Sequence, residues 1–224
     1  MTVKNAINWR KTIKKYNSEK VINHEDLTVI LEAGRLAPCS LGIEVTNVVS
    51  ITNQELKKKF ADEAMLGWNQ EKVKNASCIM LITVTNPSYL VSTEFLTKRL
   101  KRVINQADDL EKTIKKYQTF LQQKEHLFAF VSEQAHIVTS FITIQAADLR
   151  IGTTIMGGFD AKKCDELLAK HCSFDQEKYH TVLALALGYY DEDDDKATMP
   201  RVRIDFNEFA KIIWVNKKDT GFCF

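Results

Sequence analysis

Several features are scarce in this chain of 224 residues, and each scarcity excludes a class of protein. Three prolines and eight glycines are too few for a collagen-like or linker-rich architecture. The longest apolar run, at 78–85, has eight residues, less than half of a membrane span, so we expect no transmembrane helix. The first ten residues contain no continuous apolar stretch, and we therefore expect no secretory signal.

Neither sign of charge is in excess, and the cysteines form no recognisable site. The 31 basic and 29 acidic residues give a net charge of +2, which indicates neither a nucleic-acid nor a membrane partner. Five cysteines are an odd number without a C-x-x-C pair, which disfavours a disulfide scaffold and a structural zinc site. We expect a cytoplasmic protein with no bound metal and with free thiols at Cys39, Cys78, Cys164, Cys172 and Cys223.

The residues that are present suit a globular protein. Apolar residues make up 45% of the chain, and no repeat or linker divides it, so we expect a single domain over residues 1–224. Asn23 predicts a helix N-cap, and that helix must end before Pro38. Residues 52–55 form a capping box that predicts another helix, to about Met65.

Strands are expected between these helices. The run at 78–85 is apolar on both faces and predicts a central strand. Further strands are predicted at 46–51, at 152–160, where the strand runs into a Gly-Gly turn followed by an N-cap at Asp160, and at 180–188. Helices interleaved with so few strands favour an α+β fold over a doubly wound sheet.

Three segments carry more specific expectations. Residues 90–125 are mostly polar and predict an exposed helical excursion, such as a lid. Residues 126–149 are apolar nearly all round, which predicts a helix buried on every side, at the centre of the domain or of a dimer interface. His136 in that helix is interpreted as a core histidine. The acidic run at 191–195 is interpreted as a solvated loop.

The common catalytic and nucleotide-binding motifs are absent. The chain contains no G-x-G-x-x-G, P-loop, H-E-x-x-H or G-x-S-x-G sequence, and its five histidines show no metal-ligand spacing. Two basic clusters remain, at 10–14 and at 200–203. Arginine can bind phosphate with two parallel hydrogen bonds, so the two clusters could converge on one phosphate. Either cluster alone is more simply read as solvated surface charge.

Five short segments follow one another in the order of a known family. They are Arg-Lys-Thr-Ile-Lys at 10–14, Ala-Pro-Cys-Ser at 37–40, Asn69 with Lys72, Ile-Met-Gly-Gly-Phe-Asp at 155–160, and Pro-Arg-Val-Arg at 200–203. In this order and spacing, over about residues 8–206, the chain resembles the FMN-dependent nitroreductase family of the NAD(P)H-dependent, oxygen-insensitive type. The resemblance implies an α+β nitroreductase-like fold, with a mixed or antiparallel sheet of four to five strands surrounded by helices, in an intertwined homodimer.

The resemblance also implies which residues bind the cofactor. The FMN phosphate would be held by Arg10, Thr12, Arg201 and Arg203, with Lys11 in the same signature. The isoalloxazine would meet Lys14 and Lys72 at its N1/O2 edge, and Asn69 would bond the pyrimidine end or the ribityl chain. One ring face would be covered by Ile155, Met156, Gly157 and Gly158, with a backbone N–H directed at N5. Residues of the partner subunit would complete the site, namely Pro38, Cys39, Ser40 and Leu41.

The activity that the resemblance implies is oxidation of NADH or NADPH by FMN, with reduction of a small nitroaromatic or quinone-type acceptor in a ping-pong cycle. No catalytic side chain is implied, because the flavin carries the chemistry. Three departures from the family pattern stand out. Residues 41–46 lack the amide and the aromatic of the usual S-x-Q-P-W segment, Cys39 replaces a serine, and Gly157 stands where many members have glutamate. They leave open a non-catalytic FMN sensor or flavin-storage protein, and a cofactor-free interaction protein is a further alternative.

Overall fold

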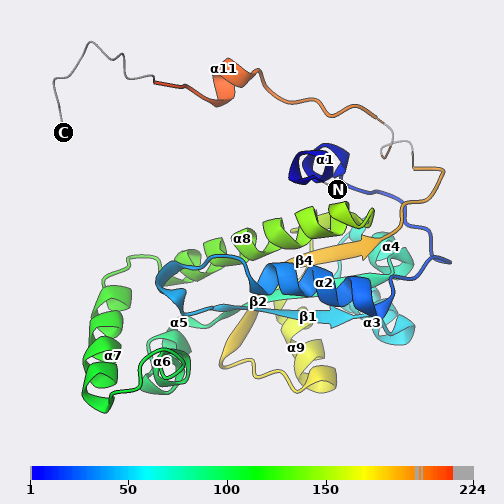
Figure 1. Ribbon diagram of the computed structural model, residues 1–224. Helices are drawn as coiled ribbons and strands as arrows, with labels where there is room; N and C mark the ends of the chain where they lie inside the picture. Colours follow the sequence, from blue (N-terminus) through cyan, green and yellow to red (C-terminus); the bar gives the residue numbers. More distant parts are fainter. Residues whose placement is uncertain (1, 195–196, 198, 214–224) are drawn as a thin grey trace, which may run out of the picture.

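The computed structural model describes residues 2–194, 197 and 199–213, and within them it forms an antiparallel sheet between two layers of helices. The sheet has the order β1-β2-β4-β3, with β2 and β4 at its centre (Figure 1). The strands are β1 (Thr46–Ile51), β2 (Cys78–Thr85), β3 (Gly152–Met156) and β4 (Tyr179–Gly188). All three pairings are antiparallel, which confirms the expected α+β class. Of the five thiols, Cys223 lies outside the described residues, and the other four are free.

One face of the sheet is covered by α2 (His24–Arg35) and α8 (Leu127–Asp148) (Figure 1). The side chains of Met80 and Leu185 pack into this layer. The start of α2 is the one predicted, since the Asn23 side chain accepts a hydrogen bond from the backbone N–H of the third helical residue. These contacts fix α8 across the sheet.

The other face is covered by α3 (Gln54–Ala64), α4 (Asn69–Asn75) and α9 (Ala161–Cys172). The expected cap of α3 is corrected by one residue. Asn53, not Thr52, is the N-cap, because its side-chain oxygen accepts from the third helical N–H at 2.9 Å. The predicted cap of α9 at Asp160 is confirmed by the same kind of bond.

The region at 90–125 is helical, as expected, and it packs more firmly than a free lid would. It contains α6 (Thr93–Leu100) and α7 (Ala107–Gln122), preceded by α5 (Pro87–Leu90). These helices lie at the end of the sheet where β1 begins (Figure 1). Buried side chains of α6 and α7 join the same core cluster as α8, namely Phe95, Leu96, Ile114 and Leu121.

Within a single chain α8 is buried on all but one stripe, so the expected place of that stripe in a dimer interface stays a prediction. Ile137 and Phe141 are 36% and 41% exposed on this stripe. His136 lies on the same side and is exposed, with Nδ1 3.0 Å from the Ser132 carbonyl oxygen, so it is not a core histidine. By length and apolar composition alone α8 could cross a membrane, but its other sides pack on the sheet and on neighbouring helices, as in a core helix.

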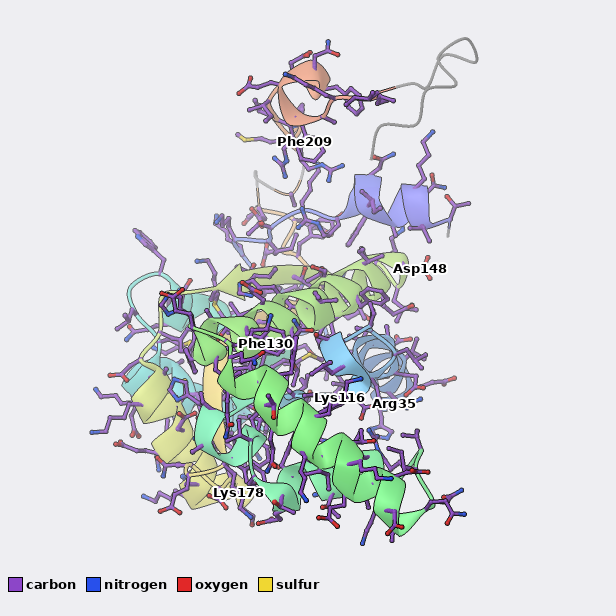
Figure 2. All side chains as sticks on the ribbon, turned by 90° about the vertical axis from the view of Figure 1, so that its left-hand side faces the viewer. Arg35, Lys116, Phe130, Asp148, Lys178 and Phe209 are labelled. Atoms are coloured by element: carbon purple, nitrogen blue, oxygen red, sulfur yellow. The ribbon has the colours of Figure 1, made fainter. Side chains whose placement is uncertain are left out.

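Both ends of the described chain lie on the α8 side of the molecule. The helix α1 (Val3–Trp9) packs on α8. The segment 199–213 leaves the body of the protein and carries α11 (Phe206–Phe209), whose Phe209 stands well apart from the other labelled residues (Figure 2). Phe206 and Phe209 are 61% and 77% exposed, so this segment presents apolar surface that one chain does not cover.

Asp165 of α9 contacts the part of β4 that does not pair with β3. β3 pairs with β4 only from Ala184 onward, and upstream the buried Asp165 carboxylate accepts hydrogen bonds from the N–H and hydroxyl of Thr181. The other Asp165 oxygen lies 2.6 Å from His180 Nδ1. This hydrogen bond raises the pKa of His180, against the opposing effect of burial.

The pair predicts a pH-dependent stability. Because the pKa of His180 is higher in the folded than in the unfolded protein, its contribution is complete below the unfolded-state pKa of about 6.5 and is lost as the pH rises through the folded-state pKa. We expect His180→Gln to remove about 1 kcal/mol of unfolding free energy at pH 6 and much less at pH 9. Urea unfolding at both pH values measures this, with the exposed His136→Gln as control. An equal loss at both values would contradict the prediction.

Candidate functional site

Three arginines from opposite ends of the chain meet beside β3. Thr12 forms a parallel bridge with the start of that strand, which places residues 10–14 along the edge of the sheet. Arg10 shares an open pocket there with Arg201 and Arg203. Burial, and then the neighbouring charges of Arg201 and Arg203, lower the pKa of Arg10. The two basic clusters therefore meet in one place, which is the arrangement that the sequence left open beside solvated surface charge.

Among the described residues, no acidic side chain neutralises the charge of this arginine cluster. Arg201 is anchored, since its guanidinium donates to the carbonyls of Ile7 and Asn8, at 2.8 and 3.3 Å, at the end of α1. Within the part of the chain that the structure describes, no carboxylate forms an ion pair with Arg10, Arg201 or Arg203. Guanidinium groups held together without a carboxylate fit an anion such as a phosphate monoester.

A chain of hydrogen bonds joins the start of α4 to the glycine turn after β3. The amine of Lys72 donates to Oδ1 of Asn69 at 2.9 Å, and Nδ2 of Asn69 donates to the carbonyl of Gly158 at 3.0 Å. Burial, followed by the nearby charge of Lys14, lowers the pKa of Lys72. Two lysine amines and an amide thus gather beside the turn.

The glycine turn itself depends on close packing at one position only. A Cβ atom on Gly158 would lie 2.9 Å from Nδ2 of Asn69, so a larger residue would displace this side chain. A Cβ atom on Gly157 would meet nothing within 4 Å, which is compatible with the glutamate that many family members have there. In the strand before the turn, Met156 is buried and Ile155 is 50% exposed.

Sequence reasoning missed Asp194, which positions one of these lysines. Its carboxylate is 3% exposed and accepts hydrogen bonds from the backbone N–H groups of Lys14 at 2.7 Å and Lys15 at 3.1 Å. The amine of Lys11 donates to the Ala197 carbonyl in the same region. The expectation of a wholly solvated acidic loop is therefore wrong at Asp194, and nothing in a run of similar acids distinguishes it. The last residue of that run, Asp195, lies outside the described residues.

The remaining predicted residues lie elsewhere in the chain. Residues 38–41 come shortly before β1, at one end of the sheet, whereas residues 10–14 lie at the opposite end (Figure 1). The backbone N–H of Ser40 is bonded to the side chain of Gln134 on α8 at 2.9 Å. One chain thus divides the predicted residues into two groups. The first is Arg10, Lys11, Thr12, Lys14, Asn69, Lys72, Ile155, Met156, Gly157, Gly158, Arg201 and Arg203, and the second is Pro38, Cys39, Ser40 and Leu41.

Comparison with known proteins identifies the family. A sequence model of the Nitroreductase family matches residues 7–189. The chain belongs to the nitroreductase family. It is 28% identical over 207 residues to a Staphylococcus haemolyticus protein whose name marks it as a candidate NAD(P)H nitroreductase, covering 89% of this chain and 94% of that protein. A Haemophilus influenzae protein with a name of the same kind is 27% identical over 192 residues, covering 82% and 86% of the two chains.

Solved structures share the fold of this chain. A nitroreductase family protein from Streptococcus pneumoniae superposes with a TM-score of 0.78 at 18% identity, covering 95% of this chain and all of that one. A protein from Exiguobacterium sibiricum, solved in complex with FMN, gives a TM-score of 0.75 at 18% identity, covering 95% and 98%. The resemblance drawn from the five short segments is thereby confirmed at the level of family and fold, and the family supports an oxidoreductase.

Proposed function

We propose that this nitroreductase binds FMN, oxidises NADH or NADPH, and reduces a nitroaromatic or quinone-type acceptor. The observation that carries the proposal is the cluster of Arg10, Arg201 and Arg203, which has no carboxylate partner among the described residues. The Lys72–Asn69–Gly158 hydrogen bonds lie at the other end of β3. FMN joins a phosphate monoester to a planar ring. The arginine cluster suits the phosphate, and the lysine and amide groups near the glycine turn suit the polar edge of the ring. The structure of the Exiguobacterium relative contains FMN, which supports the same cofactor here.

Each residue has a role that follows from its position. Arg10, Thr12 and Arg203 would bind the phosphate, while Arg201 holds α1 against them. Bound FMN would supply the transfer of hydride and electrons. The ammonium groups of Lys14 and Lys72 would stabilise negative charge at one edge of the ring, and the partial burial of Lys72 strengthens its field there.

The surface around Asn69 suits a flat acceptor. Leu66 is 57% exposed, Trp68 is 87% exposed, and Ile155 stands half exposed before the glycine turn. The backbone N–H of Leu66 bonds the Gly158 carbonyl at 3.0 Å, so this apolar surface adjoins the turn. An indole and two aliphatic side chains offer stacking and apolar contact to an aromatic ring, which supports nitroaromatic or quinone-type acceptors.

We also propose a cytoplasmic homodimer without nucleic-acid or membrane partners. The exposed stripe of α8 and the apolar 199–213 segment provide surface that a second copy would cover. A second copy would also bring its own residues 38–41 toward the flavin, which one chain does not do. The separation of the two groups of predicted residues is thus accounted for by a site shared between subunits.

The test is an absorbance titration of purified protein with FMN, followed by anaerobic addition of NADH and then NADPH. We expect a saturable change in the flavin spectrum and bleaching by one of the nicotinamides. Saturable binding without bleaching would replace the oxidoreductase by a non-catalytic flavin-binding protein. Absence of saturable binding would overturn the assignment of FMN to the arginine cluster.

A further inference from the structure

The loop that carries residues 38–41 has an unfavourable backbone. Leu41 has a φ of 60° and Glu44 a φ of 46°, and neither is a glycine. Side chains with a Cβ atom rarely adopt this left-handed region, and they remain there only where the surroundings hold them. The loop therefore needs external contacts to keep its conformation.

The contacts at Glu44 come from the end of α6. The carboxylate of Glu44 lies 2.7 Å from the guanidinium of Arg102 and 3.9 Å from that of Arg99. Arg99 is fixed in turn, since it is only 18% exposed and stacks over the Phe95 ring at 5.2 Å. Two arginines of one short region thus converge on one carboxylate of the loop.

Helix α7 and the loop itself add two more contacts. The hydroxyl of Tyr117 donates to the Leu41 carbonyl at 3.4 Å. Inside the loop, the backbone N–H of Glu44 donates to the sulfur of Cys39 at 3.2 Å, so the position of Glu44 is transmitted to Cys39. Both left-handed residues are therefore held by side chains of the region that the sequence indicated as a lid.

We propose that α6 and α7 form a clasp that presets the flavin-facing loop, with Glu44, Arg102 and Tyr117 as positioning residues. The inference rests on the proposed function, because residues 38–41 matter to catalysis only if they meet FMN across the dimer. Glu44 and Arg102 would not touch the flavin. They would act by keeping Cys39, Ser40 and Leu41 in the conformation that binds it.

The expected effect is moderate and sensitive to salt. The side chains of Glu44 and Arg102 are about half exposed, 49% and 47%, so their pairing changes the population of the preset loop by roughly threefold to fivefold. In about 1 M salt the screening length between exposed charges falls to about 3 Å, so high salt should remove most of this effect.

The first experiment measures the loop without any flavin. The alkylation rate of Cys39 is followed by peptide mass spectrometry in the wild type, Glu44→Gln, Arg102→Gln and the double variant. We expect each variant to raise the rate roughly threefold at low salt, and the double variant to match the single ones because both remove the same pair. Glu111→Gln breaks an exposed ion pair on α7, with Lys115, and serves as control without effect. Equal rates in all proteins would overturn the clasp.

The second experiment separates the clasp from the proposed function. FMN affinity is measured by flavin fluorescence in the wild type, Glu44→Gln, Tyr117→Phe and Glu111→Gln. We expect the first two variants to bind FMN roughly threefold more weakly at low salt, and Glu44→Gln to match the wild type at high salt. A wild type that binds no FMN overturns the proposed function. If the wild type binds FMN and Glu44→Gln binds it equally tightly, the clasp is overturned while the proposed function stands.

Discussion

Arg203→Gln should weaken FMN binding by about 10- to 100-fold while leaving the protein without flavin as stable as the wild type, or more stable. The loss follows from removing a charged hydrogen bond to phosphate, which contributes about 1.5–3 kcal/mol. The equal or higher stability follows from the removal of charge repulsion. Arg203 and Arg201 both lower the pKa of Arg10, and no carboxylate offsets their charges among the described residues. A site built for an anion costs stability when the anion is absent.

Riboflavin supplies the matched control for this prediction, since it has the same ring and no phosphate. Its affinity should be the same for Arg203→Gln as for the wild type. Arg35→Gln controls for the loss of any arginine, because Arg35 forms an exposed pair with Glu32 on α2. Titrations with both flavins and thermal unfolding of the flavin-free proteins measure the two effects. Equal weakening of FMN and riboflavin would show that Arg203 does not bind the phosphate.

The parts of the fold that follow from local rules could be predicted from the sequence. The strand at 78–85 could be predicted to the residue, because a run of eight apolar and β-branched residues is too short for a typical buried helix and favours a strand buried on both faces. The cap at Asn23 was predicted because one side chain satisfies one backbone N–H. The meeting of the arginine clusters was only one of two open interpretations of the residues themselves, and it was the order of the five family segments that favoured it.

The errors concern properties that depend on contacts between distant segments. An apolar helix is typical of burial, but the sequence does not say which chain covers it, and the stripe of Ile137 and Phe141 on α8 is left open within one chain. Thr52 and Asn53 are both good N-caps, and only the entry angle of the chain decides between them. Residues 191–195 contain four aspartates, and burial of one depends on the turn that returns the chain to Lys14.

Replacing that buried aspartate, in Asp194→Ala, should lower both the stability of the protein and its affinity for flavin. The carboxylate holds two backbone N–H groups, those of Lys14 and Lys15, and both would lose a charged acceptor. Hydrogen bonds to charged groups contribute about 1.5–3 kcal/mol each, and the two share one oxygen, so we expect a loss of about 3 kcal/mol in unfolding free energy. Lys14 would lose its fixed position, and FMN and riboflavin should both bind more weakly.

This response differs in kind from that of Arg203→Gln, which should spare riboflavin. Asp193→Ala is the matched control, because Asp193 is exposed and its contact with Lys15 uses the backbone carbonyl, which the substitution leaves in place. Asp194→Asn keeps an oxygen acceptor and should retain most of the stability. Urea unfolding and titration with the two flavins distinguish the variants. If Asp194→Ala weakened FMN but not riboflavin, Asp194 would act on the phosphate cluster through residues 10–12, and Lys14 would have no part in binding the ring.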